Sequence, residues 1–338
     1  MSVYFCLADI VLQEGCSSMS NRRKLGIVLG AGVGRGWAHI GVLQALTELG
    51  VKPDIVCGCS IGALVGASYV TSHLDTLARL TTSLTWRRVL SFMDVSFAGG
   101  GLIEGRWIVK FFEDNVEDTV IENARPIYGA VATELHTGRE TWLTSGSIID
   151  AVRASIAVPG LFTPIQIRGK WLVDGGLVNP LPVSLCRALG ADVIIGVSLN
   201  GDLVSRPQSL LAEESLEASQ TTSQSEWLRW LSHGLPRGVT TDSSEAIIND
   251  LEAERDRPGY IEVMGESFFI VQDFVSRVRL AADPVDLLVA PDVAHIGVME
   301  FHRAEEAIEA GRKAVTSAQD NILLLAQSTQ LKASDPIN

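Results

Sequence analysis

Apolar residues along the chain form short continuous runs that are separated by stretches with apolar positions every three or four residues. The runs at 24–29 and 53–57 predict buried strands. Between them, residues 36–50 carry isoleucine and leucine at helical spacing and end in a glycine that stops a helix. A second helix is expected over 61–71. Strand, helix, strand and helix in this order predict a parallel sheet with helices on its faces.

The rest of the chain carries the same kinds of pattern, interrupted by one stretch of different composition. Residues from about 200 to 260 are rich in Ser, Glu, Gln and Thr, which predicts a variable, partly flexible insertion. Elsewhere we expect strands over 126–135, 138–144, 170–174, 191–199 and 284–293, and helices over 104–113, 147–154, 182–189 and 303–327.

These elements predict an α/β fold, a three-layer sandwich with a mostly parallel central sheet and helices on both faces. The expected organisation is one domain over 24–338 that includes the insertion at about 200–260. Residues 1–23 predict an N-terminal tail that is disordered, or an upstream start with Met19 as the usual beginning.

The net charge and the composition exclude several kinds of binding partner. With a net charge of −13 and no stripe of Lys and Arg, the chain is not expected to bind nucleic acid. The 5 cysteines lack metal-site spacing and are odd in number, which favours reduced thiols in the cytoplasm. No run of 18 apolar residues predicts a membrane span, although peripheral membrane contact stays open. Neither a metal nor a cofactor is expected.

One motif stands at a predicted strand-to-helix turn. Ser60 lies between Gly58 and Gly62 in the pattern Gly-x-Ser-x-Gly, directly after the second strand. A nucleophilic serine in α/β hydrolases occupies such a turn, where the two glycines avoid steric conflict. The alternative is a tight turn whose hydroxyl has only a structural partner.

A glycine-rich loop follows the first strand. Gly30, Gly32, Gly34 and Gly36 leave backbone N–H groups that can converge on an oxyanion. A phosphate-binding loop is the rival interpretation. However, the loop lacks the Gly-Lys-Ser/Thr ending of a nucleotide site, and Arg35 occupies the position of a dinucleotide fingerprint's third glycine.

A serine nucleophile also needs a base. The 6 histidines include none in a convincing position, and His39, one turn into the first helix, favours a buried structural role. Asp174 is the better candidate, because it ends an apolar strand before Gly175 and Gly176. We expect it at the carboxyl edge of the sheet, where Ser60 and the glycine loop lie.

Together, the glycine loop, Gly-x-Ser-x-Gly and Asp-Gly-Gly about 115 residues later resemble the patatin-like phospholipases. The resemblance covers 24–199 and includes 132–140 and 151–165, with details similar to the small bacterial subgroup that includes RssA. It implies a Ser-Asp dyad that hydrolyses acyl esters of lipids, with Ser60 as nucleophile and Asp174 as proton acceptor. The loop departs from the family's three consecutive glycines, since Ala31 and Val33 interrupt it.

The same resemblance assigns the backbone N–H groups of Gly32, Val33 and Gly34 to the oxyanion hole. It assigns Arg35 to loop support or to contact with a lipid phosphate. The substrate is expected to be a phospholipid or lysophospholipid. The alternative is a regulatory or interaction protein with little turnover.

Two further segments leave alternatives open. Residues 225–235 place tryptophan and leucine side chains together, which suits a membrane interface or packing against the domain. The final helix over 303–327 covers the sheet or forms a homo-oligomer contact.

Overall fold

The computed structural model describes residues 22–84, 101–103, 111, 114, 120–199, 260–297 and 299–330. The tail, nearly all of the insertion, the 225–235 segment and most of the predicted 104–113 helix lie outside these residues. The division into tail, single domain and insertion therefore stays a prediction.

The core of the fold is an 8-stranded sheet in the order β10-β9-β1-β2-β4-β8-β7, with β5 paired to β4. The strands from β10 to β4 run parallel, whereas β5, β7 and β8 pair antiparallel. The mostly parallel sheet predicted from the sequence is thus confirmed. Its strands are β1 (Leu25–Leu29), β2 (Ile55–Cys59), β4 (Ile127–Glu134), β5 (Glu140–Leu143), β7 (Ile165–Ile167), β8 (Lys170–Asp174), β9 (Val193–Val197) and β10 (Leu287–Val289). A second sheet pairs β3 (Gly101–Ile103) with β6 (Gly160–Phe162).

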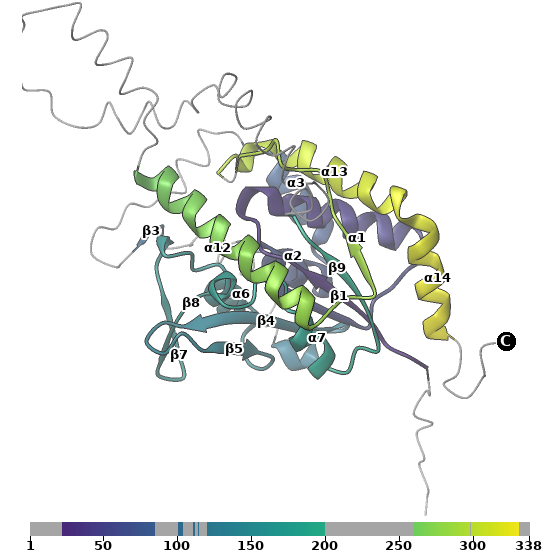
Figure 1. Ribbon diagram of the computed structural model, residues 1–338, viewed down its shortest axis with the longest axis horizontal. Coiled ribbons are helices and arrows are strands. Elements are labelled where there is room, and N and C mark those ends of the chain that lie inside the picture. The colour runs from purple at the N-terminus through teal and green to yellow at the C-terminus, as the bar shows by residue number, and fades with distance from the viewer. Residues whose placement is uncertain are drawn as a thin grey trace, which may run out of the picture.

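Helices cover both faces of the sheet, as predicted. Ile27 packs into a large core with the helices of one face, whereas Val28 packs into a smaller core with α7 and the end of α12 on the other. In Figure 1, α12 crosses in front of the sheet toward α7, while α1 and α13 lie side by side. The helices are α1 (Ala38–Glu48), α2 (Ile61–Val70), α3 (Leu74–Thr82), α6 (Ile148–Ser155), α7 (Val183–Ala188), α12 (Tyr260–Ala282), α13 (Ala304–Ser317) and α14 (Gln319–Gln330).

The register of β4 explains how the fold builds its site. β2 pairs with β4 up to Val131, and β8 pairs with β4 from Ala132 onward. β5 pairs with both of these residues, so it occupies the opposite side of β4. β2 and β8 therefore share one side of β4 and run toward each other. Their carboxyl ends, at Cys59 and Asp174, meet at the junction of Val131 and Ala132.

The predicted final helix over 303–327 is wrong in its continuity. The chain forms two helices, α13 and α14, which are separated at Ala318, where φ is −101° and ψ is 8°. α13 packs closely on α1, because Gly41 and Gly311 bring the two backbones together. A Cβ on either glycine would overlap a backbone carbonyl of the other helix. α13 therefore belongs to the layer that covers the sheet.

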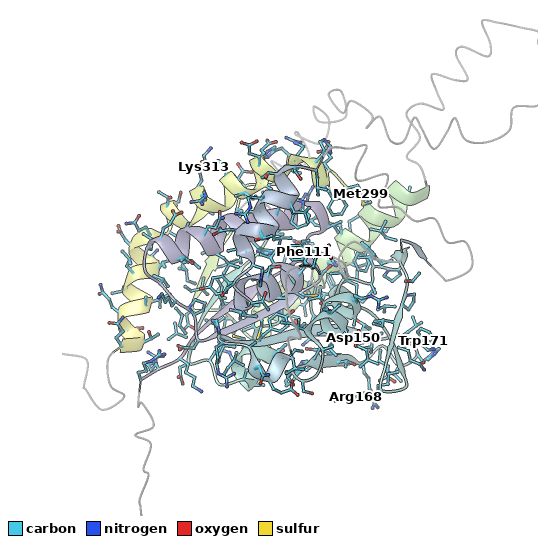
Figure 2. All side chains as sticks on the ribbon, turned by 180° about the vertical axis from the view of Figure 1, so that it is seen from behind. Phe111, Asp150, Arg168, Trp171, Met299 and Lys313 are labelled. Atoms are coloured by element: carbon cyan, nitrogen blue, oxygen red, sulfur yellow. The ribbon has the colours of Figure 1, made fainter. Side chains whose placement is uncertain are left out.

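No helix among the described residues is long and apolar enough to cross a membrane. Figure 2 shows the molecule from behind, with Lys313 on the outer side of α13. Trp171 and Arg168 project at the other end, from the hairpin of β7 and β8.

Candidate active site

Ser60 occupies a sharp turn between β2 and α2. Its φ of 56° and ψ of −126° lie outside the regions that non-glycine residues prefer. Gly62 permits the turn, because a Cβ there would overlap the carbonyl oxygen of Leu29. Gly58 lies equally close to Gly62. The turn is thus a strained strand-to-helix elbow in which only glycine fits on either side of the serine.

Asp174 accepts a hydrogen bond from the hydroxyl of Ser60. The Ser60 hydroxyl donates to Asp174 Oδ2 over 2.6 Å, and the Gly176 N–H donates to Asp174 Oδ1 over 2.7 Å. Asp174 is fully buried, and this desolvation raises the pKa of its carboxyl to about 7, although both hydrogen bonds act to lower it. A carboxylate with a pKa near neutrality is a stronger base than an exposed aspartate.

The direction of β8 differs from what we expected for Asp174. We placed this residue at the carboxyl edge of the sheet, as if its strand ran parallel to the others. β8 is antiparallel to β4, so its carboxyl end points back toward the middle of the sheet. Asp174 reaches Ser60 because the two strands meet end to end along β4.

Ser155, at the end of α6, closes this junction and was not singled out from the sequence. Its hydroxyl accepts the Ser60 N–H over 2.9 Å and donates to the carbonyl of Val131 over 2.7 Å. Ser155 is fully buried. Because β2 and β8 both end at this point of β4, the Ser155 hydroxyl connects α6, the end of β2 and β4 where they meet.

The glycine loop lies beside the elbow. Gly36 packs against Ile61, the first residue of α2, so closely that a Cβ would overlap that side chain. Among the described residues, no group accepts a hydrogen bond from the N–H of Gly32, Val33 or Gly34. These are the N–H groups assigned to the oxyanion hole, and they remain available to a ligand.

Val33 adopts a φ of 49°, which is unusual for a β-branched residue. Glycine adopts a positive φ without steric conflict, and this chain places valine there. Strain of this kind costs roughly 1 to 2 kcal/mol and is common at functional sites.

Arg35 and His39 hold the loop from two sides. Arg35 donates from Nε to the carbonyl of Ile296 over 2.6 Å, and its guanidinium stacks over the ring of Phe269 in α12. His39 lies 2.8 Å from the carbonyl of Gly30, and burial lowers its pKa to about 4. The neutral ring therefore donates from Nε2 to Gly30.

Gly175 and Gly176 allow other elements to approach the base. A Cβ on Gly175 would overlap the carbonyl of Val131. A Cβ on Gly176 would overlap Nε2 of Gln272 in α12 and lie 2.9 Å from Asp174 Oδ1. Gln272 is 1% exposed, and its Nε2 has no hydrogen-bond partner in the described part of the chain. α12 therefore brings a donor to the Gly176 turn beside Asp174, and the sequence did not reveal it.

The described histidines lie elsewhere. His295 pairs with Glu306 over 2.8 Å on the surface, His302 lies in a short 3-10 turn, and His233 is outside the described residues. The described residues contain no cluster of three or more His, Cys, Asp or Glu side chains that could hold a metal ion.

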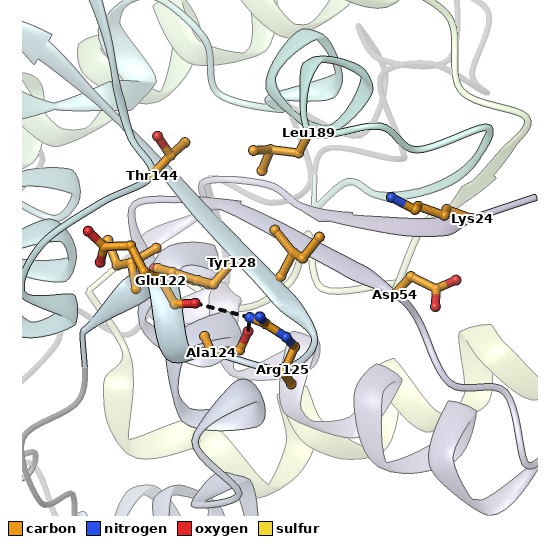
Figure 3. Close-up of a pocket in the computed structure, with 10 residues that line it drawn as sticks. Lys24, Asp54, Glu122, Ala124, Arg125, Tyr128, Thr144 and Leu189 are labelled. Atoms are coloured by element: carbon orange, nitrogen blue, oxygen red, sulfur yellow. Dashed lines mark hydrogen bonds between the residues drawn. The ribbon is translucent and has the colours of Figure 1, made fainter. Parts of the chain in front are cut away.

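A separate cavity of about 430 Å³ lies at the amino ends of β1, β2 and β4, whereas Ser60 lies at the opposite, carboxyl end of β2. Figure 3 shows Arg125 in this cavity, where it donates to the carbonyls of Glu122 and Ala124. Asp54, also in its lining, accepts hydrogen bonds from Arg22 and the Leu25 N–H. Since the protein itself satisfies these charged groups, we assign no chemistry to the cavity.

Comparison with known proteins identifies the family. The family model described as patatin-like phospholipase matches residues 27–187, which include the glycine loop, Ser60 and Asp174. An uncharacterized NTE family protein of Mycobacterium bovis is 32% identical over 340 residues, covering 88% of this chain and 92% of the relative. The match to the RssA subgroup is not tested by these relatives and stays a prediction.

Two further proteins resemble this chain over only part of their own length. Lysophospholipase NTE1 of Pyricularia oryzae is 27% identical over 305 residues, covering 86% of this chain and 18% of the fungal protein. The crystal structure of VipD from Legionella pneumophila aligns with a TM-score of 0.40 and 13% identity over 89% of this chain and 67% of VipD. On the match to the family model and to the mycobacterial relative, the chain belongs to the patatin-like phospholipase family of ester hydrolases.

Proposed function

We propose that this protein is a serine acyl hydrolase that cleaves carboxylic esters of phospholipids or lysophospholipids through a Ser60–Asp174 dyad. The observation that carries the proposal is the 2.6 Å hydrogen bond from the hydroxyl of Ser60, on a strained elbow, to the buried carboxylate of Asp174. The name of the fungal relative, a lysophospholipase, agrees with this substrate class.

In the first step, Ser60 Oγ attacks the ester carbonyl carbon while Asp174 Oδ2 accepts the hydroxyl proton. The carbonyl oxygen becomes an oxyanion, which the N–H groups of Gly32, Val33 and Gly34 stabilise by roughly 3 to 4 kcal/mol per good donor. Collapse of this intermediate releases the alcohol, which takes the proton from Asp174, and leaves the acyl group on Ser60.

In the second step, water attacks the acyl-enzyme. Asp174 accepts a proton from the water, the same N–H groups hold the oxyanion, and Ser60 regains its proton as the fatty acid leaves. Arg35 supports the loop in this scheme, since its guanidinium binds backbone carbonyls at 294 and 296. The scheme needs no metal ion or organic cofactor.

The test is reaction of the purified protein with a fluorophosphonate probe. Wild-type protein should be labelled at Ser60, with a rate that rises with pH through about 7 as the Asp174 carboxyl loses its proton. Ser60→Ala should abolish labelling, and Asp174→Asn should slow it by roughly 100-fold or more.

Release of fatty acid from phosphatidylcholine and from lysophosphatidylcholine then distinguishes the two substrates. Labelling that survives Ser60→Ala in folded protein would rule out this serine as the nucleophile. A labelling rate that is flat between pH 5 and 9 would rule out Asp174 as the base.

A further inference from the structure

Helix α12 directs polar side chains toward the protein interior. Gln272, Asp273 and Ser276 are 1%, 3% and 6% exposed. Gln272 contacts the Gly176 turn beside Asp174, and Asp273 forms an ion pair with Arg277 on the same helix. The inner side of α12 thus belongs to the surroundings of the catalytic base.

The outer side of the same helix is apolar. Ile270, Phe274 and Val278 are 66%, 64% and 54% exposed, and their spacing of four residues aligns them along the helix. Val263 and Val271 extend this surface, which we call the α12 outer face, at 45% and 46% exposure. A helix on the surface of a globular protein normally has the reverse arrangement, so this apolar face marks an interaction site.

The charge of this region differs from that of the whole chain. The chain has a net charge of −13, yet between Ile270 and Val278 the only carboxylate is Asp273, which is buried and paired with Arg277. Glu266, one turn before Ile270, is exposed between Val263 and this stretch. The Arg277 side chain is 49% exposed at the border of the outer face. From Ile270 to Val278 the face is apolar and has no exposed carboxylate, and such a surface with an arginine at its border is complementary to lipid acyl chains and headgroup phosphates.

We propose that the α12 outer face docks the protein on a zwitterionic phospholipid surface. The choice of lipid as the partner rests on the proposed function, since the inner side of the same helix contacts the Gly176 turn of the catalytic site. Docking through the outer face brings the turn that carries Asp174 to within one helix diameter of the lipid. We choose a zwitterionic surface because the negative net charge of the protein would be repelled by anionic lipid.

The test compares two aspartate substitutions at equally exposed apolar positions, in the full chain. Phe274→Asp places a charge in the outer face, and Leu324→Asp, at a residue 67% exposed on α14, is the matched control. Flotation with phosphatidylcholine vesicles should show binding of wild type and Leu324→Asp, and a loss of roughly tenfold or more for Phe274→Asp. The ratio of turnover on vesicle lipid to turnover on soluble 4-nitrophenyl butyrate should fall by a similar factor.

Three results would overturn the docking surface. Equal vesicle binding by Phe274→Asp and wild type would remove the helix from the lipid contact. A wild-type dimer that Phe274→Asp dissociates in light scattering would assign the face to a second copy of this chain. A lower melting temperature together with lost turnover of the soluble ester would assign it to internal packing.

Failure of the proposed function gives a different result. If wild-type protein binds vesicles through Phe274 but neither reacts with the fluorophosphonate nor hydrolyses the soluble ester, the lipid surface stands and the serine hydrolase does not.

Discussion

At the scale of single residues, the backbone geometry of Ser60, the proposed nucleophile, involves the hydroxyl of Ser155. The Ser60 N–H is fixed by that oxygen, and Ser60 holds a backbone conformation that few non-glycine residues adopt. The same hydroxyl satisfies the carbonyl of Val131. We therefore infer that Ser155 is a positioning residue, because its hydroxyl bonds the backbone of Ser60 and of Val131 and makes no hydrogen bond to Asp174.

We expect Ser155→Ala to leave two buried backbone groups without partners and to destabilise the fold by about 2 kcal/mol. Because the Ser60 elbow would relax, the rate of fluorophosphonate labelling should fall roughly tenfold at a temperature where the protein stays folded. Ser68→Ala is the matched control, since Ser68 is also fully buried but bonds only the carbonyl of Leu64 in its own helix. Equal labelling rates in the two variants would contradict a positioning role for Ser155.

The sequence was sufficient to nominate Ser60 and Asp174, because each lies in a short motif whose local geometry has few alternatives. It was not sufficient for Ser155 or Gln272. Nothing in the residues around Ser155 distinguishes it from an ordinary helical serine, and its importance arises only where β2, β4 and α6 meet. Gln272 lies about 100 residues after Asp174 in the chain, so only tertiary structure connects the two.

At the scale of elements, a close helix contact joins α1 and α13. Gly41 and Gly311 lie at this crossing, where each backbone approaches a carbonyl of the other helix. Neither glycine is needed for a positive φ. Their role is to allow the approach, and with it the packing of α13 over the face that contains α1.

Gly311→Ala should lower the free energy of unfolding by roughly 1 to 3 kcal/mol, because the added methyl group overlaps the carbonyl of Ala38. Gly265→Ala in α12 is the control, because a Cβ there meets nothing within 4 Å. This second change should stabilise the protein by up to about 1 kcal/mol through helix propensity. Urea denaturation measures both, and a loss of equal size in the two variants would remove the contact as the cause.

Helices and strands whose apolar residues are buried and whose polar residues are exposed could be predicted from the sequence. The succession from β1 to α2 has buried strands and helices that are apolar and largely buried, so the alternation of the two patterns gave the correct order. α12 was not predicted, since its apolar residues, such as Phe274, face outward while its polar residues are buried. The boundary at Ala318 was also missed, because apolar residues continue through it and the break depends on where α14 packs.

At the scale of the whole molecule, burial of the Asp174 carboxylate lowers the free energy of unfolding. In the unfolded chain Asp174 has its ordinary pKa of 3.8, whereas burial raises the pKa to about 7 in the folded protein. Between these values the folded state holds a proton that the unfolded state has released. Stability therefore falls as pH rises through this window, and the full penalty is present above pH 7.

Asp174→Asn removes this penalty and should raise the free energy of unfolding. The gain should be larger at pH 8 than at pH 5, by roughly 2 to 3 kcal/mol. Thermal or urea unfolding at both pH values provides the measurement. Asp150→Asn, at an exposed aspartate on α6, is the control for replacing a carboxylate by an amide. A gain for Asp174→Asn that shrinks toward pH 8 would contradict the direction of the pKa shift.

The meeting of β2 and β8 on one side of β4 has a consequence for how this enzyme tolerates change. The proposed nucleophile and base, Ser60 and Asp174, are 114 residues apart in sequence, yet the pairing of β2 and β8 with β4 sets their separation. The loops that connect these strands can lengthen or shorten without altering the pairing that sets this separation. A single residue inserted into β4 beside Val131 would shift the two strand ends by about 3.3 Å and turn one of them to the opposite face.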